Sequence, residues 1–233
     1  MLVRLGEPPV EVELRRNARA RRFTLTVPQA GGPPRLTMPK YASEREARAF
    51  LSKQGDWLRG AMARRPGEVI VGIGSRIPVE GRLRTVVAMP GRRLPPVAHG
   101  DALVLTGGAP DEAGRRIEAW LKLSARTRLA AISEAAAGRI GARVARIALR
   151  DTRGRWGSCS SRGNLNFSWR LAMAPAHVLD YVAVHEAAHL VEMNHGPRFW
   201  ALVERLRPDW RTSRDWLRRE GASLHRYRFS AAE

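Results

Sequence analysis

Cysteine is nearly absent from this sequence of 233 residues, since Cys159 is the only one. A single thiol excludes a disulfide within the chain and favours a reducing compartment, so we expect the cytoplasm. Apolar runs of the length of a signal peptide or a membrane span are also missing, and we expect no membrane association. The length allows one large domain or two small ones and leaves the oligomeric state open.

Acidic residues are scarce relative to basic ones, 22 against 41, which gives a formal net charge of +19. This charge makes a nucleic acid or a nucleotide a candidate partner. Lysine is rare as well, because only Lys40, Lys53 and Lys122 occur and the other basic residues are arginine. Codon usage alone can produce such a skew. The arginines are spread along the chain and no known nucleic-acid-binding module is found, so charge alone does not establish this partner.

Residues 1–108 are expected to form a β-rich N-terminal region with one helix. Alternating segments over 10–14, 23–27 and 35–38 predict short antiparallel strands. Ser43 and Glu46 form a capping-box signature ahead of apolar residues at helical spacing, from Ala47 to Met62, which predicts one helix. Short β-like runs then continue, and Gly107-Gly108 marks the expected domain boundary.

Residues 109–233 are expected to form a second domain, which makes the predicted fold class α+β. Pro110 predicts the start of a long helix ending near Gly138. Apolar and polar residues alternate over 164–171, which predicts a strand with one buried face, after a polar turn over 151–163. Pro175 begins a helix that is apolar on almost all sides, as a central buried helix would be. Two shorter helices are predicted near the end of the chain.

The sequence His185-Glu186-Ala187-Ala188-His189 lies within this apolar helix. A spacing of four residues places the two imidazoles on one helical face, where both can bind one metal ion, for which we expect zinc. Without a metal, two buried and unpaired histidines would be costly. Glu186 lies beside them and is suited to act as a catalytic base. The other histidines outside the 185–195 segment lack this spacing, namely His99, His177 and His225.

His195 is the preferred third ligand, because a catalytic zinc site has three protein ligands and one open position. The spacing HExxHxxxxxH matches that of the metzincin proteases, but Glu192 stands where they have glycine, so we expect the turn at Asn194. Glu192 offers an alternative third ligand, in a His, His, Glu set. Cys159 is a further group that can approach the metal as a thiolate.

Several of these segments resemble the YgjP-like family of bacterial metal-dependent hydrolases. The resemblance covers residues 151–217, with its most specific parts in Arg155-Trp156-Gly157-Ser158-Cys159-Ser160, the 185–189 motif, Asn194-His195 and Phe199-Trp200. It implies a zincin-like C-terminal domain with His185, His189 and His195 as zinc ligands and Glu186 as the catalytic base. A more distant similarity is to the SprT-type zinc proteases.

The leading interpretation is therefore a zinc-dependent metallopeptidase that uses a metal-activated water, with Glu186 as general base and a peptide or protein as substrate. Strand 164–171 is expected to add an extended substrate to a sheet edge, with Asn166, Arg170 and Tyr181 as candidate substrate contacts. One alternative is a metal-dependent nucleotide phosphohydrolase or pyrophosphatase. A second is a non-catalytic nucleic-acid-binding protein with a structural metal.

Overall fold

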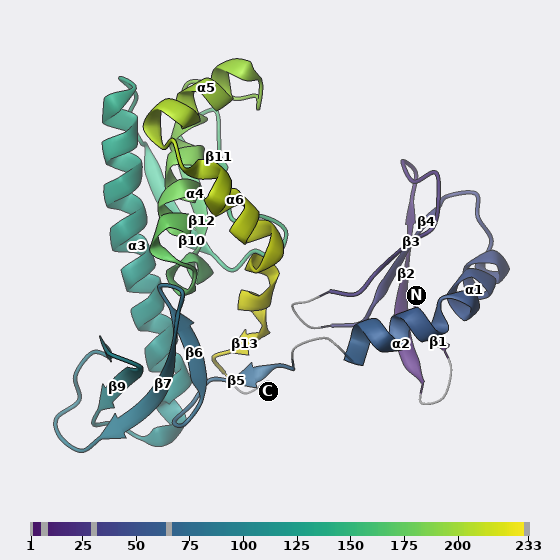
Figure 1. The fold of residues 1–233 in the computed structure, drawn as a ribbon, viewed down its shortest axis with the longest axis horizontal. Helices are drawn as coiled ribbons and strands as arrows, with labels where there is room; N and C mark the ends of the chain where they lie inside the picture. Colours follow the sequence, from purple (N-terminus) through teal and green to yellow (C-terminus); the bar gives the residue numbers. More distant parts are fainter. Residues whose placement is uncertain (1, 6–8, 29–31, 64–66, 231–233) are drawn as a thin grey trace. The chain divides into compact units, whose positions relative to one another are not determined.

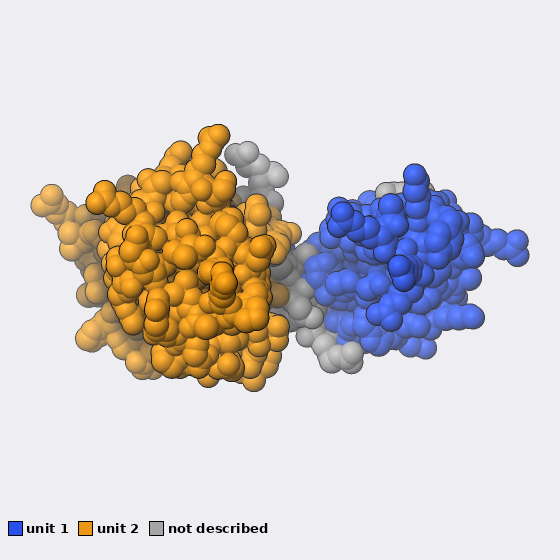
Figure 2. Space-filling view, turned by 90° about the horizontal axis from the view of Figure 1, so that it is seen from above, with its two compact units in different colours: residues 1–68 blue, residues 69–233 orange. Residues whose placement is uncertain are grey.

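The computed structural model describes residues 2–5, 9–28, 32–63 and 67–230. The chain divides into two compact units, Met1–Glu68 and Val69–Glu233, which Figure 2 draws in blue and orange. Helices and several small sheets make up the structure, in agreement with the expected α+β class. Within these described ranges, every helix is too short or too polar to cross a bilayer.

Unit 1 contains a four-stranded sheet in the order β1-β2-β4-β3. Its strands are β1 (Leu2–Leu5), β2 (Val10–Asn17), β3 (Thr24–Thr26) and β4 (Arg35–Pro39). The last three lie where the sequence predicts strands. The expected antiparallel pairing is wrong for β2 and β4, which run parallel. The chain first crosses to the edge position of β3 and then returns, antiparallel to β3, beside β2.

Two helices, α1 (Glu44–Lys53) and α2 (Gly55–Ala63), cover this sheet where the sequence predicts one. The capping box is confirmed, because Ser43 Oγ accepts the Glu46 N–H and the Glu46 carboxylate accepts the Ser43 N–H. The predicted single helix is interrupted at Gln54, the C-terminal cap of α1, whose N–H donates to carbonyls of the last turn of that helix. Leu51 and Leu58, one from each helix, are both fully buried in the core of unit 1.

Unit 2 begins with small sheets that share a core with the long helix α3 (Ala113–Arg139). The strands are β5 (Val69–Ile70), β6 (Arg76–Val79), β7 (Arg82–Met89), β8 (Val97–His99) and β9 (Ala102–Thr106), and β13 (Tyr227–Arg228) pairs with β5. The division between the units therefore differs from the boundary expected near residue 108. The reason is packing, since Ile77, Val86 and Leu103 lie in one hydrophobic cluster with Ile117 and Leu121 of α3.

The rest of unit 2 surrounds a three-stranded sheet in the order β10-β12-β11. Its strands are β10 (Arg146–Arg150), β11 (Gly157–Cys159) and β12 (Asn164–Ser168). The helices are α4 (Ala176–Ala188), α5 (Pro197–Leu206) and α6 (Trp210–Arg219), with short 3₁₀ helices η1 (Pro110–Glu112), η2 (Trp169–Met173) and η3 (Gly221–Arg226). Figure 1 shows α3 and α4 running side by side, and these two helices pack against each other. Helix α4 is thus enclosed by α3, α5, α6 and the sheet.

Strand β12 differs from its prediction in length and in place. It ends at Ser168, and Trp169 to Met173 form η2 instead of continuing the strand. It is also the central strand, paired with β10 on one side and with β11 on the other. Both of its edges are therefore occupied, so the expected addition of a substrate along residues 164–171 is wrong. The strand that borders α4 at the sheet edge is β11, within the segment expected to be a turn.

Arg170 lies in η2 and is only 7% exposed, which does not fit its expected role as a substrate contact. Its Nε and one terminal nitrogen donate to the Asp151 carboxylate at 2.7 and 3.0 Å. The other terminal nitrogen donates to the Leu224 and Tyr227 carbonyls. All of these partners belong to the chain, and two of them lie in its C-terminal segment. Arg170 therefore joins the C-terminal segment to the sheet.

Replacing Arg170 by methionine should lower the free energy of unfolding by about 2–4 kcal/mol, because two buried carbonyls and a carboxylate lose their donor. Arg82→Met is the matched control, because Arg82 also pairs with an aspartate, Asp101, at 2.8 Å but both side chains are exposed. We expect it to cost less than about 1 kcal/mol. Urea unfolding followed by circular dichroism measures both values, and equal losses would contradict the role of Arg170.

The ion pair between Arg170 and Asp151 makes the stability of the fold depend on pH. Burial opposes ionisation of Asp151, but the bonds from Arg170 outweigh it and lower the pKa of the carboxyl below its usual 3.8. A carboxyl group whose pKa is lower in the folded state than in the unfolded state stabilises the fold at pH values above its unfolded pKa. This stabilisation is lost as the pH falls through its folded pKa. The difference in stability between the native chain and Arg170→Met should therefore be constant at neutral pH and shrink below about pH 4.

Candidate metal centre and active site

Helix α4 carries His185 and Glu186, and it ends at Ala188 with His189 as the C-terminal cap. The Leu190 N–H donates to the Ala187 carbonyl three residues earlier, instead of four as in an α-helix, and the chain then turns away from the helix axis. The expected turn at Asn194 is therefore preceded by an earlier end of the helix. A second tight turn does lie there, because the Gly196 N–H donates to the Asn194 carbonyl at 2.7 Å. Together these two turns bring His195 back towards the helix.

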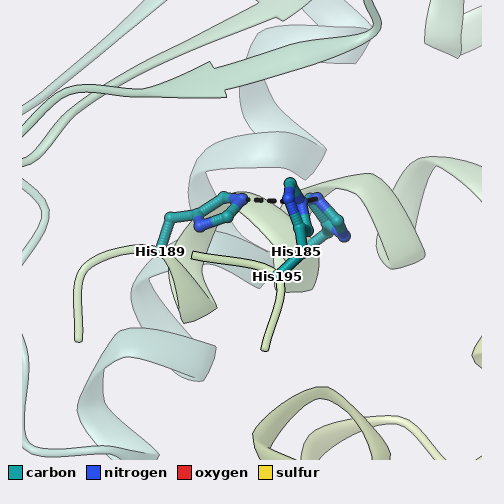
Figure 3. Close-up of side chains that lie close together, drawn as sticks. All are labelled: His185, His189 and His195. Carbon is teal, nitrogen blue, oxygen red and sulfur yellow. Dashed lines mark hydrogen bonds between the residues drawn. The ribbon is translucent and has the colours of Figure 1, made fainter. Parts of the chain in front are cut away.

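The three histidines converge on one point (Figure 3). His195 Nε2 lies 3.0 Å from His185 Nε2 and 3.2 Å from His189 Nε2. Two nitrogens that bind one tetrahedral zinc ion at about 2.0 Å lie about 3.3 Å apart. The spacing of the imidazoles thus fits a single zinc ion. Three nitrogen ligands with a fourth position left for water or substrate are typical of catalytic zinc sites.

The hydrogen bonds of the rings support the same conclusion. His189 Nδ1 donates to the Glu192 backbone carbonyl at 2.9 Å, which in a neutral ring leaves the lone pair on Nε2, facing the other histidines. His185 Nδ1 lies 3.4 Å from the Tyr181 hydroxyl. Contacts of this kind orient metal-binding histidines in proteins. Tyr181, which the sequence suggests as a substrate contact, therefore also contacts a candidate ligand.

Burial and the two neighbouring imidazoles lower the pKa of His185 to about 3. Burial also lowers the pKa of His189, against the effect of its bond to Glu192. Both rings are therefore neutral at physiological pH. A metal ligand must be neutral imidazole, so neither histidine has to lose a proton before it binds an ion.

Glu186 is 5% exposed, and burial raises the pKa of its carboxyl to about 8, partly opposed by the charge of Arg155. A carboxyl group whose pKa lies near neutrality can both accept and donate a proton. The side chain packs against Gly157 at the start of β11, where a Cβ would lie 2.5 Å from Glu186 Oε1. Only glycine leaves room for this carboxylate.

Aromatic residues of α5 and α6 support the histidines, and the sequence pattern did not identify them. The Phe199 ring is fully buried and lies 4.4 to 4.9 Å from all three imidazoles, measured between ring centres. Trp200 lies against His185 and His195 and stacks on Trp210. The available signal was the Phe199-Trp200 pair shortly after His195. These rings exclude water from one side of the cluster.

The two alternative ligands lie outside the group. Among the described residues, the cluster of candidate ligand atoms contains the three histidines alone, so neither Glu192 nor Cys159 belongs to it. Glu192 takes part through its backbone carbonyl. Burial, and then the proximity of Glu186, raise the pKa of the Cys159 thiol, whereas a thiolate ligand needs a low pKa.

Of the candidate substrate contacts, Asn166 lies in β12 and lines a pocket of about 290 Å³ next to β11, together with Arg150 and Arg155. A different pocket, of about 320 Å³, reaches Tyr181, His185 and Glu186. The structure thus places Asn166 and Tyr181 at cavities. It places Arg170 in the interior of the fold.

Comparison with known proteins gives one match. No curated protein and no solved structure shows significant similarity to the chain. The family model of the YgjP-like metallopeptidase domain matches residues 21–220, which include the histidine cluster, β11, α6 and most of unit 1. The family implies a metal ion and a hydrolase activity, in agreement with the geometry above. The chain belongs to the YgjP-like metallopeptidase domain family.

Proposed function

We propose that the chain is a zinc-dependent peptidase with a zincin-like catalytic domain in unit 2. The observation that supports this most directly is the convergence of three imidazole nitrogens beside a buried carboxyl group. In this proposal His185, His189 and His195 hold one zinc ion. When bound, zinc supplies a Lewis acid that polarises a carbonyl group and acidifies water.

Glu186 serves as the general base and then as the general acid. Its carboxylate accepts a proton from the attacking water and delivers that proton to the amine that leaves. Its packing against Gly157 holds the carboxylate at the edge of β11. Tyr181 orients His185, and the Glu192 carbonyl orients His189. Phe199 is buried against all three imidazoles and shields one side of the group from water, which strengthens electrostatic interactions there.

A peptide is the substrate that the surroundings favour. β11 is an edge strand beside Glu186, and an extended peptide can pair with such an edge through its backbone. Asn166 on the neighbouring strand lines the cavity beside this edge, where it can contact a substrate side chain. The arginines near the site also leave a nucleotide as a competing substrate, which the first experiment below separates from a peptide.

Glu186→Gln should lower the rate of peptide hydrolysis by about 10²–10⁴-fold, because the general base is lost. Metal content should remain at the native level, since Glu186 is not a ligand in this proposal. Purified protein of known zinc content is tested against a protein-derived peptide library and against a panel of nucleoside triphosphates, with Glu134→Gln as the control at an exposed position on α3. Hydrolysis of nucleotides alone would overturn the peptidase proposal.

His195→Ala should weaken zinc binding by at least about 100-fold, because one of three ligands is removed. Glu192→Gln should keep the native affinity, since only the backbone of Glu192 contacts the cluster. Competition with a chelating dye measures both affinities. The opposite result, in which zinc is lost from Glu192→Gln and kept by His195→Ala, would establish the His, His, Glu set.

Gly157→Ala should lower kcat about 100-fold, because a displacement of the catalytic group by about 1 Å has an effect of this size. The added methyl group overlaps the Glu186 side chain, which has little free space to move into. Zinc content should remain at the native level, while the overlap should lower the free energy of unfolding by about 1–3 kcal/mol, so kcat is measured well below the melting temperature of both variants. Gly154→Ala is the matched control in the same segment, since no atom lies within 4 Å of a Cβ there. Equal kcat values for the two variants would show that Gly157 does not hold Glu186.

A further inference from the structure

The pocket of about 320 Å³ beside the histidine cluster is basic. It is lined by Glu186 and His185, by Trp156 next to β11, and by Arg214, Leu217 and Arg218 of α6. Among the described residues that line it, Glu186 is the only one with a carboxyl group. A substrate that occupies this pocket therefore meets two guanidinium groups within reach of the reacting atoms.

Arg214 is held in place but lacks an anionic partner. Its guanidinium carbon lies 4.6 Å from the centre of the Trp210 ring and 5.6 Å from that of Trp200. Both contacts are within the range of cation–π interactions. Its Nε is buried and has no hydrogen-bond acceptor among the described residues. No carboxylate in the described part of the chain forms an ion pair with it.

Two other arginines of unit 2, Arg128 and Arg170, are paired with carboxylates. Arg128 donates to Asp180 through two nitrogens, and Arg170 donates to Asp151 in the same way. A polar group that is buried without a partner is costly because it loses its hydrogen bonds to water, and this applies to the Nε of Arg214. An arginine that is oriented by aromatic rings, faces a cavity and has no anion thus has the properties of a group that binds a ligand anion.

Arg218 adds a second positive charge on the same side of the helix. It lies four residues after Arg214, the spacing that places two side chains on one helical face. Its only ion pair among the described residues is a long one of 3.9 Å to Asp215, and its side chain is mostly exposed. Arg218 is therefore free to turn towards the mouth of the pocket.

We propose that Arg214, together with Arg218, binds a carboxylate group of the peptide substrate next to the bond that is cleaved. This inference rests on the proposed peptidase function and specifies its substrate class. The planar guanidinium matches a carboxylate through two parallel hydrogen bonds. The carboxylate comes either from an aspartate or glutamate side chain or from the C-terminus of the peptide.

The native enzyme alone provides the first test. A peptide library identifies a cleaved sequence, which is then synthesised with one change at a time: aspartate to asparagine, glutamate to glutamine, and C-terminal acid to amide. One of these neutralisations should lower kcat/KM by about 10- to 100-fold, which corresponds to the loss of one charged hydrogen-bonded contact. A side-chain change identifies an internal acidic residue, and the amide identifies the C-terminal carboxylate.

Arg214→Gln should remove the difference between the acidic peptide and its neutral counterpart by lowering kcat/KM for the acidic one. Arg214→Lys keeps the charge without the planar pair of donors and should retain part of the difference. Arg211→Gln is the matched control, because Arg211 also lies over Trp210 in α6 but pairs with Glu204 and does not line the pocket. It should retain the full difference.

The outcomes separate this inference from the proposed function. The carboxylate site is refuted, and the peptidase function stands, if peptides are cleaved but neutralisation never changes kcat/KM. The same holds if Arg214→Gln lowers kcat/KM equally for the acidic and the neutral peptide. If no peptide is cleaved and nucleotides are hydrolysed in a reaction that requires Glu186, both proposals fail. Should Arg214→Gln not fold, the comparison of acidic and neutral peptides with the native enzyme still decides.

Discussion

The convergence of three imidazole nitrogens, with His195 Nε2 at 3.0 and 3.2 Å from those of His185 and His189, is the constraint on which the rest of unit 2 depends. A single helix can present only two of them, at positions 185 and 189, because the next turn of a helix would carry residue 195 away from that face. The helix therefore ends at Ala188, and the chain reverses before α5 begins at Pro197. Phe199, near the start of α5, fills the space beneath the three rings. The end of α4 and the start of α5 thus form one structural unit with the cluster.

The second constraint concerns the carboxyl group beside the cluster. Glu186 lies on a helix enclosed by other helices and the sheet, where desolvation keeps its pKa near 8. In the proposed mechanism this carboxyl group must remain close to water and substrate while most of its surface is buried. β11 satisfies both conditions, since it covers Glu186 with a residue that has no side chain and offers an unpaired strand edge beside it. Gly157 thus allows the close contact with Glu186, and the terminal position of β11 in the sheet leaves its edge unpaired among the described strands.

The parts of the site that the sequence predicts are those set by local spacing. An α-helix has 3.6 residues per turn, so His185 and His189 could be placed on one face, and Glu186 beside it, from the sequence alone. The backbone preferences of Asn194 and Gly196 likewise predict a turn around His195. In unit 1, the capping box at Ser43 and Glu46 is local in the same sense.

The parts that the sequence did not predict depend on contacts between distant segments. Alternation over residues 164–171 is the same for a central strand and an edge strand, and it continued by chance through Trp169 and Arg170, which belong to a 3₁₀ helix. The role of Gly157 depends on Glu186, and the role of Arg170 depends on carbonyls more than fifty residues later in the chain. The division between the two compact units differs from the boundary expected at Gly107-Gly108 for a related reason. Glycine pairs indicate turns but do not indicate which hydrophobic core the preceding strands join.

The large excess of arginine takes on a different meaning once its contacts are known. Arg116 donates to the carbonyls of Leu94, Thr106 and Gly107, Arg128 pairs with the mostly buried Asp180, and Arg170 pairs with Asp151. Most of the described arginines are exposed, but these three stabilise the packing of the fold, where the guanidinium supplies several donors at once. What distinguishes Arg214 from these residues is that aromatic rings fix its position while its donors have no partner in the described chain. A net charge of +19 gives little information about a substrate, whereas one oriented and unpaired arginine beside the buried carboxyl group of Glu186 indicates the sign and the shape of the group that it would bind.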